Sequence, residues 1–365
     1  MKKQYFLPLA VISLLFSFFI SCGSDDSDNY SEIPEESPVV FDITAVPYPK
    51  LSDYNFFEGE MKNLQPVNGV LPYDLNSSLF TDYALKKRFV WMPDNVTATY
   101  DTDGSILNFP KGAVLIKNFY YNNVQPDNTT KIIETRILIK KEDGWIFANY
   151  IWNDEQTEAT YSLNGNTVPI SWEQNGVTLQ TNYRIPSELE CFKCHQLFDA
   201  NTPIGPKPQN LNKNFNFSDG NSNQLQKWVE KGYLDSSNLP SEIVSTVDWH
   251  DETKPLEDRV RSYLDINCAH CHSPNTYCGY TPMNLAYSAG NTTENFGICT
   301  PPLDFASGGQ EYIIKAGDAR NSLLPFKMAS LDPVEMMPQI GRTLKDDDAL
   351  QMINAWINNM ETPCD

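Results

Sequence analysis

Two stretches of the sequence place cysteine and histidine at a spacing suited to covalent cofactor chemistry. They read Cys191-Phe-Lys-Cys194-His195 and Cys268-Ala-His-Cys271-His272. Two cysteines three positions apart lie about one helical turn from each other, so both thiols can bond to the two vinyl groups of one porphyrin. The histidine that follows then lies under the porphyrin iron as an axial ligand. The C-x-x-C-H pattern therefore predicts two covalently bound c-type haems.

Other chemistry fits the same residues less well. A thioredoxin-type redox pair does not require a histidine after its second cysteine, and here a histidine follows both times. A zinc ribbon keeps its two C-x-x-C pairs much closer in sequence than Cys191 and Cys268 are. Plain disulfides are the third alternative, because an exported chain meets an oxidising compartment.

The chain begins like an exported lipoprotein. Residues 1–21 consist of a basic start and an apolar run that is short for a membrane span and typical of a signal peptide. Cys22 follows at the position of a lipobox cysteine, which receives a diacylglycerol before the signal peptide is removed. An ordinary signal peptide with a chance cysteine is the alternative. Residues 22–38 are rich in Ser, Asp and Glu and predict a disordered acidic tether.

The overall charge limits the classes of partner. The 365 residues carry a formal net charge of −20, and the pI is about 4.5. No basic patch is visible for the phosphate backbone of a nucleic acid, whereas an acidic surface suits basic protein partners. Together with Cys22, these features predict a protein held by lipid at the outer membrane, on its periplasmic face or at the cell surface. Its expected partners are redox proteins that act as electron donor and acceptor.

Three cysteines lie outside the haem motifs and the lipid site: Cys278, Cys299 and Cys364. In an oxidising compartment one disulfide among them is expected, with one thiol left over. The preferred pair is Cys299–Cys364, which would tie the end of the chain back to its own domain. The pair Cys278–Cys299 is the alternative.

Residues 39–184 predict a β-rich domain. Short runs of β-branched and aromatic residues alternate with turn-forming pairs such as Asn164-Gly165 and Asn175-Gly176. Helical periodicity of useful length does not appear there. The expected fold of this part is an antiparallel β-sandwich-like domain.

The pattern changes after residue 184, and from there we expect two mainly α-helical haem segments. The first covers residues 185–250 and the second residues 251–365. Apolar residues at helical spacing predict helices over about 223–231, from 256 to the second motif, and over about 346–360. The whole chain is thus expected to be an α+β protein of several domains.

The second motif follows an expected helix, and Met337-Pro-Gln-Ile-Gly341 precedes an amphipathic helix that ends the chain. This order of features resembles class I cytochrome c. The resemblance implies that the second motif supplies both thioether cysteines and the proximal ligand His272, and that Met337 is the distal iron ligand. Met336 and Met328 are the rival distal ligands, because a methionine is more often core filler than a ligand.

The first motif matches that family less completely. Cys191 and Cys194 correspond to the thioether cysteines and His195 to the proximal ligand, but the segment up to the second motif contains no methionine. His250 is the candidate sixth ligand, although a lone histidine in a linker is more often a surface residue. Met92 and an open, five-coordinate iron are the alternatives.

Four segments of the sequence carry a second, broader resemblance. They are Tyr73–Phe80, Phe109–Gly112, Trp152–Glu155 and Asn267–His272. With them the whole arrangement resembles an uncharacterised bacterial family of dihaem c-type cytochromes with an N-terminal β domain. The resemblance implies two covalently bound haem c groups and transfer of electrons between redox partners. A dihaem peroxidase-like enzyme with an open first iron is the alternative, but no distal acid–base residues are recognisable and no catalytic residue is predicted.

Overall fold

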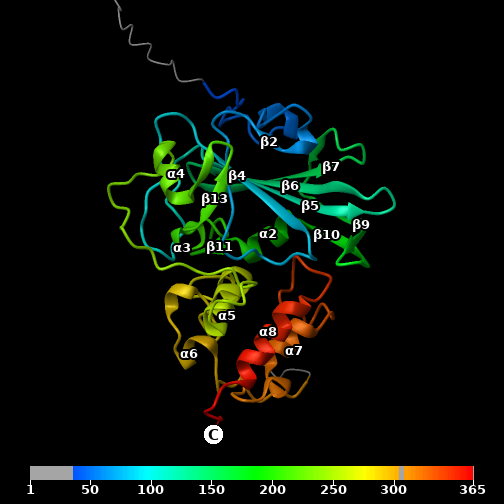
Figure 1. The fold of residues 1–365 in the computed structure, drawn as a ribbon, viewed down its shortest axis with the longest axis vertical. Coiled ribbons are helices and arrows are strands. Elements are labelled where there is room, and N and C mark those ends of the chain that lie inside the picture. The colour runs from blue at the N-terminus through cyan, green and yellow to red at the C-terminus, as the bar shows by residue number, and fades with distance from the viewer. Residues whose placement is uncertain (1–35, 304–307, 365) are drawn as a thin grey trace, which may run out of the picture. The chain divides into compact units, whose positions relative to one another are not determined.

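The computed structural model describes residues 36–303 and 308–364 (Figure 1). Residues from Ser37 onward form one compact unit. The expected signal peptide, the lipid site Cys22 and nearly all of the acidic tether lie outside the described residues. Within the described part, no helix is long and apolar enough to cross a membrane.

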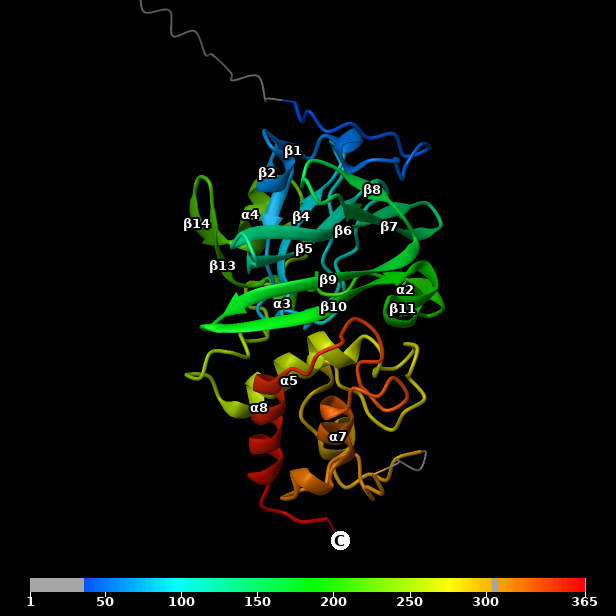
Figure 2. The same cartoon turned by 90° about the vertical axis from the view of Figure 1, so that its right-hand side faces the viewer.

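One antiparallel sheet of eight strands dominates the N-terminal half of this unit (Figures 1 and 2). Its strands are β3 (Leu71–Tyr73), β4 (Leu85–Trp91), β5 (Val114–Val124), β6 (Thr129–Lys141), β7 (Gly144–Trp152), β8 (Ala159–Tyr161), β9 (Asn164–Gln174) and β10 (Val177–Ser187). The path runs β10-β9-β5-β6-β7-β8, and β4 pairs with both β3 and β5. The β9–β10 hairpin meets β5 only at its end, where Val124 lies opposite Trp172.

The two faces of the sheet pack against different parts of the chain. Side chains alternate along a strand, so Val114 and Ile116 of β5 point to one face and Leu115 to the other. The first face is covered by N-terminal residues. These lie in η1 (Leu51–Tyr54), η2 (Met61–Asn63) and the hairpin of β1 (Phe57–Glu58) and β2 (Gln65–Pro66). The opposite face is covered by the segment that carries the first C-x-x-C-H motif.

That covering segment consists of short elements. They are α2 (Glu188–Cys194), β11 (Gln196–Leu197), β12 (Ala200–Asn201), α3 (Pro208–Leu211), β13 (Asn214–Phe217), β14 (Gly220–Asn223) and α4 (Gln224–Glu230). Leu211, Leu225 and Trp228 are buried in one apolar cluster with Leu115 and Leu138 of the sheet. The first motif segment therefore shares its core with the sheet.

The C-terminal part packs its helices around a separate apolar cluster. Its elements are α5 (Leu256–Leu264), a π-helical turn (Asp265–Ala269), η4 (Tyr287–Ala289), α6 (Thr293–Phe296), η5 (Ala319–Asn321), α7 (Leu323–Ala329) and α8 (Asp347–Asn358). Val260 and Leu264 of α5 are buried with Ile353 and Ile357 of α8. A disulfide joins Cys299 to Cys364, the pair that the sequence favoured.

The expected fold class is wrong in two respects. The β part is a single eight-stranded sheet covered by loops, hairpins and short helices, rather than a sandwich of two large sheets. Two mainly α-helical haem segments do not form in the described residues: the helices of the first segment have four to seven residues, and two hairpins lie among them. Local periodicity could not show this, because the apolar residues around Trp228 complement a sheet face instead of another helix.

Candidate functional site

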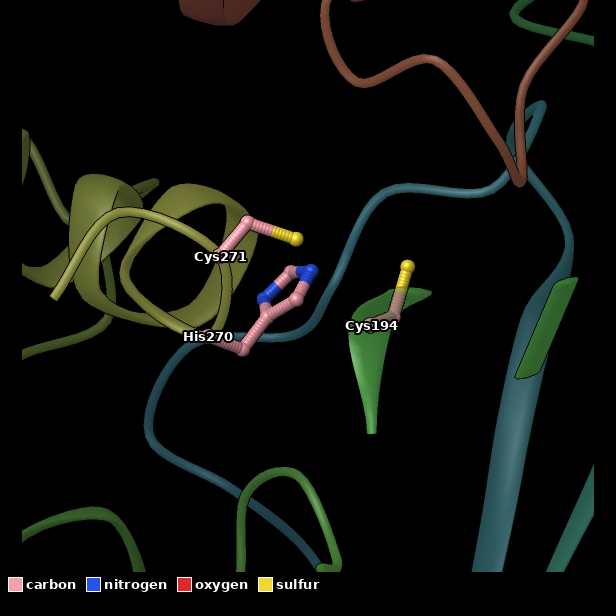
Figure 3. Close-up of side chains that lie close together, drawn as sticks. All are labelled: Cys194, His270 and Cys271. Atoms are coloured by element: carbon pink, nitrogen blue, oxygen red, sulfur yellow. The ribbon is translucent and has the colours of Figure 1, made fainter. Parts of the chain in front are cut away.

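The fold brings the two C-x-x-C-H motifs into contact. The Sγ of Cys271 lies 3.3 Å from the carbonyl oxygen of Lys193, which belongs to the first motif, 78 residues earlier. The ligand atoms of Cys194, His270 and Cys271 all lie within 4.8 Å of one another. Figure 3 shows the His270 ring next to the Cys271 sulfur, with the Cys194 sulfur pointing into the same space. Residues far apart in sequence thus form one Cys/His cluster.

Helix α2 positions the first motif directly after the sheet ends. Ser187, the last residue of β10, is the N-cap of α2, and its backbone N–H donates to the Glu190 carboxylate at 3.0 Å. This hydrogen bond gives an acceptor to a backbone N–H group that the start of the helix leaves without an intrahelical partner. The helix ends at Cys194, and His195 closes it by donating its backbone N–H to the Cys191 carbonyl at 2.9 Å. Both thiols of the motif therefore lie on one short helix anchored to the sheet.

His195 is held as a neutral ring with one nitrogen free. Its Nδ1 lies 2.8 Å from the carbonyl oxygen of Thr202. A carbonyl can only accept, so Nδ1 carries the proton and Nε2 is left as a lone-pair donor. Burial lowers the pKa of His195 to about 4, so the ring is neutral at pH 7. A neutral imidazole with an oriented Nε2 is the form that binds iron.

His272 of the second motif has the same arrangement with a different partner. Its Nδ1 lies 3.0 Å from the hydroxyl oxygen of Thr281, and that hydroxyl donates its own hydrogen to the Cys278 carbonyl at 2.8 Å. The hydroxyl must therefore accept from Nδ1, which leaves Nε2 of His272 unprotonated. Burial, followed by repulsion from His270, lowers the pKa of His272 to about 4. Both motif histidines are thus prepared as metal ligands.

The first motif opens onto a cavity between α2 and the sheet. The cavity has about 110 Å³ of space. Its walls are mostly apolar: Leu79, Leu115, Ile116, Leu138, Phe147, Pro203, Ile204, Pro206 and Ile340. Cys191, Cys194 and His195 line one side of it. This space is smaller than the roughly 300–1000 Å³ of ordinary small-ligand pockets, so a large group would enter only if the walls moved apart, and the lining suits a group that is largely apolar.

The second motif opens onto a different cavity of about 350 Å³. Cys268, Cys271 and His272 line it together with apolar side chains, namely Met283, Leu285, Ile313, Leu323, Leu324, Met328, Met337 and Ile340. The two cavities share motif residues, because Cys194 of the first motif and His270 of the second line both of them.

Among the candidate distal methionines, Met337 and Met328 line the second cavity, whereas Met336 is buried and is not among its lining residues. Arg342 holds the Met337 loop in place. Its guanidinium donates to the carbonyl of Met337 at 2.9 Å and to that of Ser330 at 2.9 Å. The backbone of Met337 is thus held by Arg342, and Met337 and His272 line the same cavity.

The proposed sixth ligands of the first haem are not brought to the first cavity. His250 is exposed, stacks against Trp249 with ring centroids 3.6 Å apart, and does not line this cavity. Met92 is 2% exposed in the core and does not line it either. Among the described residues, the first cavity has no methionine in its lining.

The fold places several polar residues in the first cavity that the sequence analysis did not single out, among them Lys117, Arg136 and His270. His270 also lines the second cavity, and its Nδ1 is buried without a hydrogen-bond partner among the described residues. The signal in the sequence was weak. Lys117 follows the apolar pair Leu115-Ile116 and Arg136 precedes Ile137-Leu138, and His270 occupies a variable position inside the second motif.

The thiols of the cluster differ in acidity. Interaction with Cys271, followed by that with His270, holds the pKa of Cys194 well below its usual range, and the neighbouring Cys194 raises the pKa of Cys271. Burial raises the pKa of Cys191 to about 11 and that of Cys268 to about 12. Cys194 is thus the most nucleophilic of the four, because the thiolate is the form that reacts and binds metals.

Comparison with family models, with curated proteins and with solved structures found no match for this chain. The resemblance to a dihaem cytochrome family therefore stays a prediction that depends on the motifs themselves.

Proposed function

We propose that this chain carries two covalently bound haem c groups and moves electrons between redox partner proteins. The thioethers would form at Cys191 and Cys194 for the first haem and at Cys268 and Cys271 for the second. The observation that carries the proposal is the meeting of the two motifs through Lys193 and Cys271, beside two neighbouring cavities with mostly apolar walls. Two groups attached there would lie side by side.

The residues around each motif fit such groups. His195 and His272 present an unprotonated Nε2 because a carbonyl and a hydroxyl fix the proton on Nδ1. The apolar walls would exclude water and lower the local dielectric, which affects the redox potential. When bound, each haem supplies an iron that accepts and releases one electron. Met337 would complete the coordination of the second iron.

The test is the haem content of the protein produced with its leader in a host that attaches haem c. We expect a pyridine haemochrome spectrum of the thioether type, with two haems per chain. The double variant Cys191→Ser/Cys194→Ser should retain one haem, and so should Cys268→Ser/Cys271→Ser. The matched control Cys278→Ser should retain two. A chain that contains no haem under these conditions overturns the proposal.

A second measurement separates a pure electron carrier from a dihaem peroxidase-like enzyme. The first cavity has no methionine among the described residues that line it, which favours an open first iron. Binding of carbon monoxide to one haem of the reduced protein, together with turnover of peroxide, would support the enzyme. No carbon monoxide shift with two haems bound would support electron transfer alone.

A zinc site is the candidate function from another class. Cys194, His270 and Cys271 supply two sulfur atoms and one nitrogen within 4.8 Å of one another, a ligand set typical of zinc. Thioether formation at Cys194 and Cys271 consumes both thiolates, so one chain cannot hold zinc there and two haems. Elemental analysis of the preparation used for the haem count distinguishes the two: one zinc and no haem would favour the metal site.

Attachment to a membrane through Cys22 is part of the same proposal. The supporting observation is the sequence alone, an apolar run followed by Cys22. Incorporation of labelled fatty acid into the full chain, and its loss in Cys22→Ser, would support a lipid anchor. Equal labelling of both proteins would contradict it.

A further inference from the structure

A row of cationic side chains crosses the sheet face that forms one wall of the first cavity. Arg88 of β4 lies opposite Lys117 of β5, Lys117 opposite Arg136 of β6, and Arg136 opposite Asn149 of β7. Residues paired across antiparallel strands point to the same face. Lys117, Arg136 and Asn149 line the cavity, next to the apolar row of Leu115, Leu138 and Phe147. One wall of the cavity thus changes from apolar to cationic.

Two of the three cations in this row have a carboxylate partner. Arg88 lies 2.6 Å from Asp74, and Arg136 lies 2.5 Å from Glu134. Lys117 has no carboxylate oxygen within 4.0 Å among the described residues. Its ammonium lies 4.8 Å from the centre of the Phe119 ring. Glu190, an acidic residue that lines the cavity, is already paired with Arg184.

An ammonium in such a place is costly without an anion. Burying a charge away from water is expensive unless an opposite charge accompanies it. Burial, followed by repulsion from Arg88, Lys86 and Arg136, lowers the pKa of Lys117 well below its usual value. The chain as a whole carries a formal charge of −20, so this concentration of positive charge opposes the general trend. An anionic group on the occupant of the cavity would favour the protonated form of Lys117 and pair its charge.

The distribution of apolar and cationic residues in the lining indicates which kind of anion would fit. A cavity that is mostly apolar but cationic along one row suits a molecule with a broad apolar body and carboxylates at one edge. A porphyrin with its two propionate groups is such a molecule, and the thiols of Cys191 and Cys194 line the same cavity. A free small anion would satisfy the charge but would leave the apolar walls unfilled.

We infer that Lys117, with Arg136 beside it, binds the propionate carboxylates of the haem attached to Cys191 and Cys194. The inference rests on the proposed function, since it assumes that haem is bound. It assigns Lys117 a positioning role: the ammonium orients the porphyrin edge and stabilises negative charge beside it. A positive charge near the haem also favours the reduced state, which carries one more electron.

The experiment compares the two-haem protein with three variants by potentiometric titration followed in the visible spectrum. Lys117→Met removes the charge and keeps a long side chain, whereas Lys117→Arg keeps the charge. Lys111→Met is the control, because Lys111 is 56% exposed and paired with Glu142 at the surface. We expect the midpoint potential of one haem to fall in Lys117→Met. Both potentials should stay unchanged in Lys117→Arg and Lys111→Met.

The outcomes distinguish failure of the proposed haem binding from failure of the role inferred for Lys117. If the wild-type chain contains no haem, the proposed function fails first. If two haems are bound and Lys117→Met leaves both potentials unchanged, the inference about Lys117 is overturned. A free anion is distinguished by titrating the wild type with inorganic phosphate at constant ionic strength. A potential that follows phosphate in the wild type but not in Lys117→Met would overturn the propionate assignment.

Discussion

The Sγ of Cys271 lies 3.3 Å from the carbonyl oxygen of Lys193, so the second C-x-x-C-H motif rests against the last turn of α2. Two consequences follow from this contact. The cavities of the two motifs become neighbours, and Ile340 and Pro338 line both of them. Cofactors held in the two cavities would exchange electrons over a short path through this contact.

Substitution of Met337 tests the second iron site. Met337→Ala should lower the midpoint potential of one haem, because a methionine ligand raises the potential, and should allow carbon monoxide to bind that haem. Met336→Ala is the matched control, since Met336 is buried next to Met337 but does not line the cavity. Met328→Ala tests the rival ligand. If Met328→Ala gives the potential shift and Met337→Ala does not, the two assignments must be exchanged.

Asp82 attaches the loop that contains Thr343 and Leu344 to the β part, and its substitution tests how much this attachment stabilises the fold. Its carboxylate, 1% exposed, accepts hydrogen bonds from the backbone N–H groups of Thr343 and Leu344 at 2.6 and 2.7 Å. Asp82→Ala leaves these donors unpaired, so the free energy of unfolding should fall by about 3 kcal/mol. Denaturant titration measures the loss. The exposed Asp127→Ala is the control, and an equal midpoint for wild type and Asp82→Ala would contradict the prediction.

The disulfide provides a test of the C-terminal part. Cys299 and Cys364 are 65 residues apart, and closing a loop of this length restricts the unfolded chain. The double variant Cys299→Ser/Cys364→Ser should lose about 4 kcal/mol on the chain-entropy estimate. Denaturant unfolding under non-reducing conditions checks this. Cys278→Ser should unfold near the wild-type midpoint, because Cys278 is outside the disulfide.

Lys86 predicts a dependence of stability on pH. Burial, followed by repulsion from Arg88 and Arg136, lowers the pKa of Lys86 to about 7. In the unfolded chain the pKa returns to about 10.4. Between these values the unfolded state holds more protons, so this residue makes stability rise with pH from about 7 to 10.4. Across that range, the unfolding free energy of Lys86→Met should rise less steeply with pH than that of the wild type. Parallel pH profiles would contradict the shift.

Much of the local structure follows from local sequence. The apolar spacing predicted helices over about 223–231 and 346–360, and α4 covers Gln224–Glu230 and α8 covers Asp347–Asn358. The Asn175-Gly176 pair forms the turn between β9 and β10, with Gly176 at a φ of +75° that glycine adopts freely. Such features depend on residues a few positions apart, so they can be recognised without the fold.

The sequence by itself determined which reactive groups each C-x-x-C-H motif contains, since two thiols and an imidazole are placed within five consecutive residues. Only the tertiary structure decided that the motifs touch, that His250 stays at the surface, and that Lys117 lines the cavity of the first motif. It also decided that the first motif segment packs on the sheet instead of forming a helical domain. The physical reason is the distance along the chain over which each feature is set. The spacing within a motif follows from covalent geometry. The tertiary contacts depend on how strands and loops that are distant in sequence bury their apolar faces together.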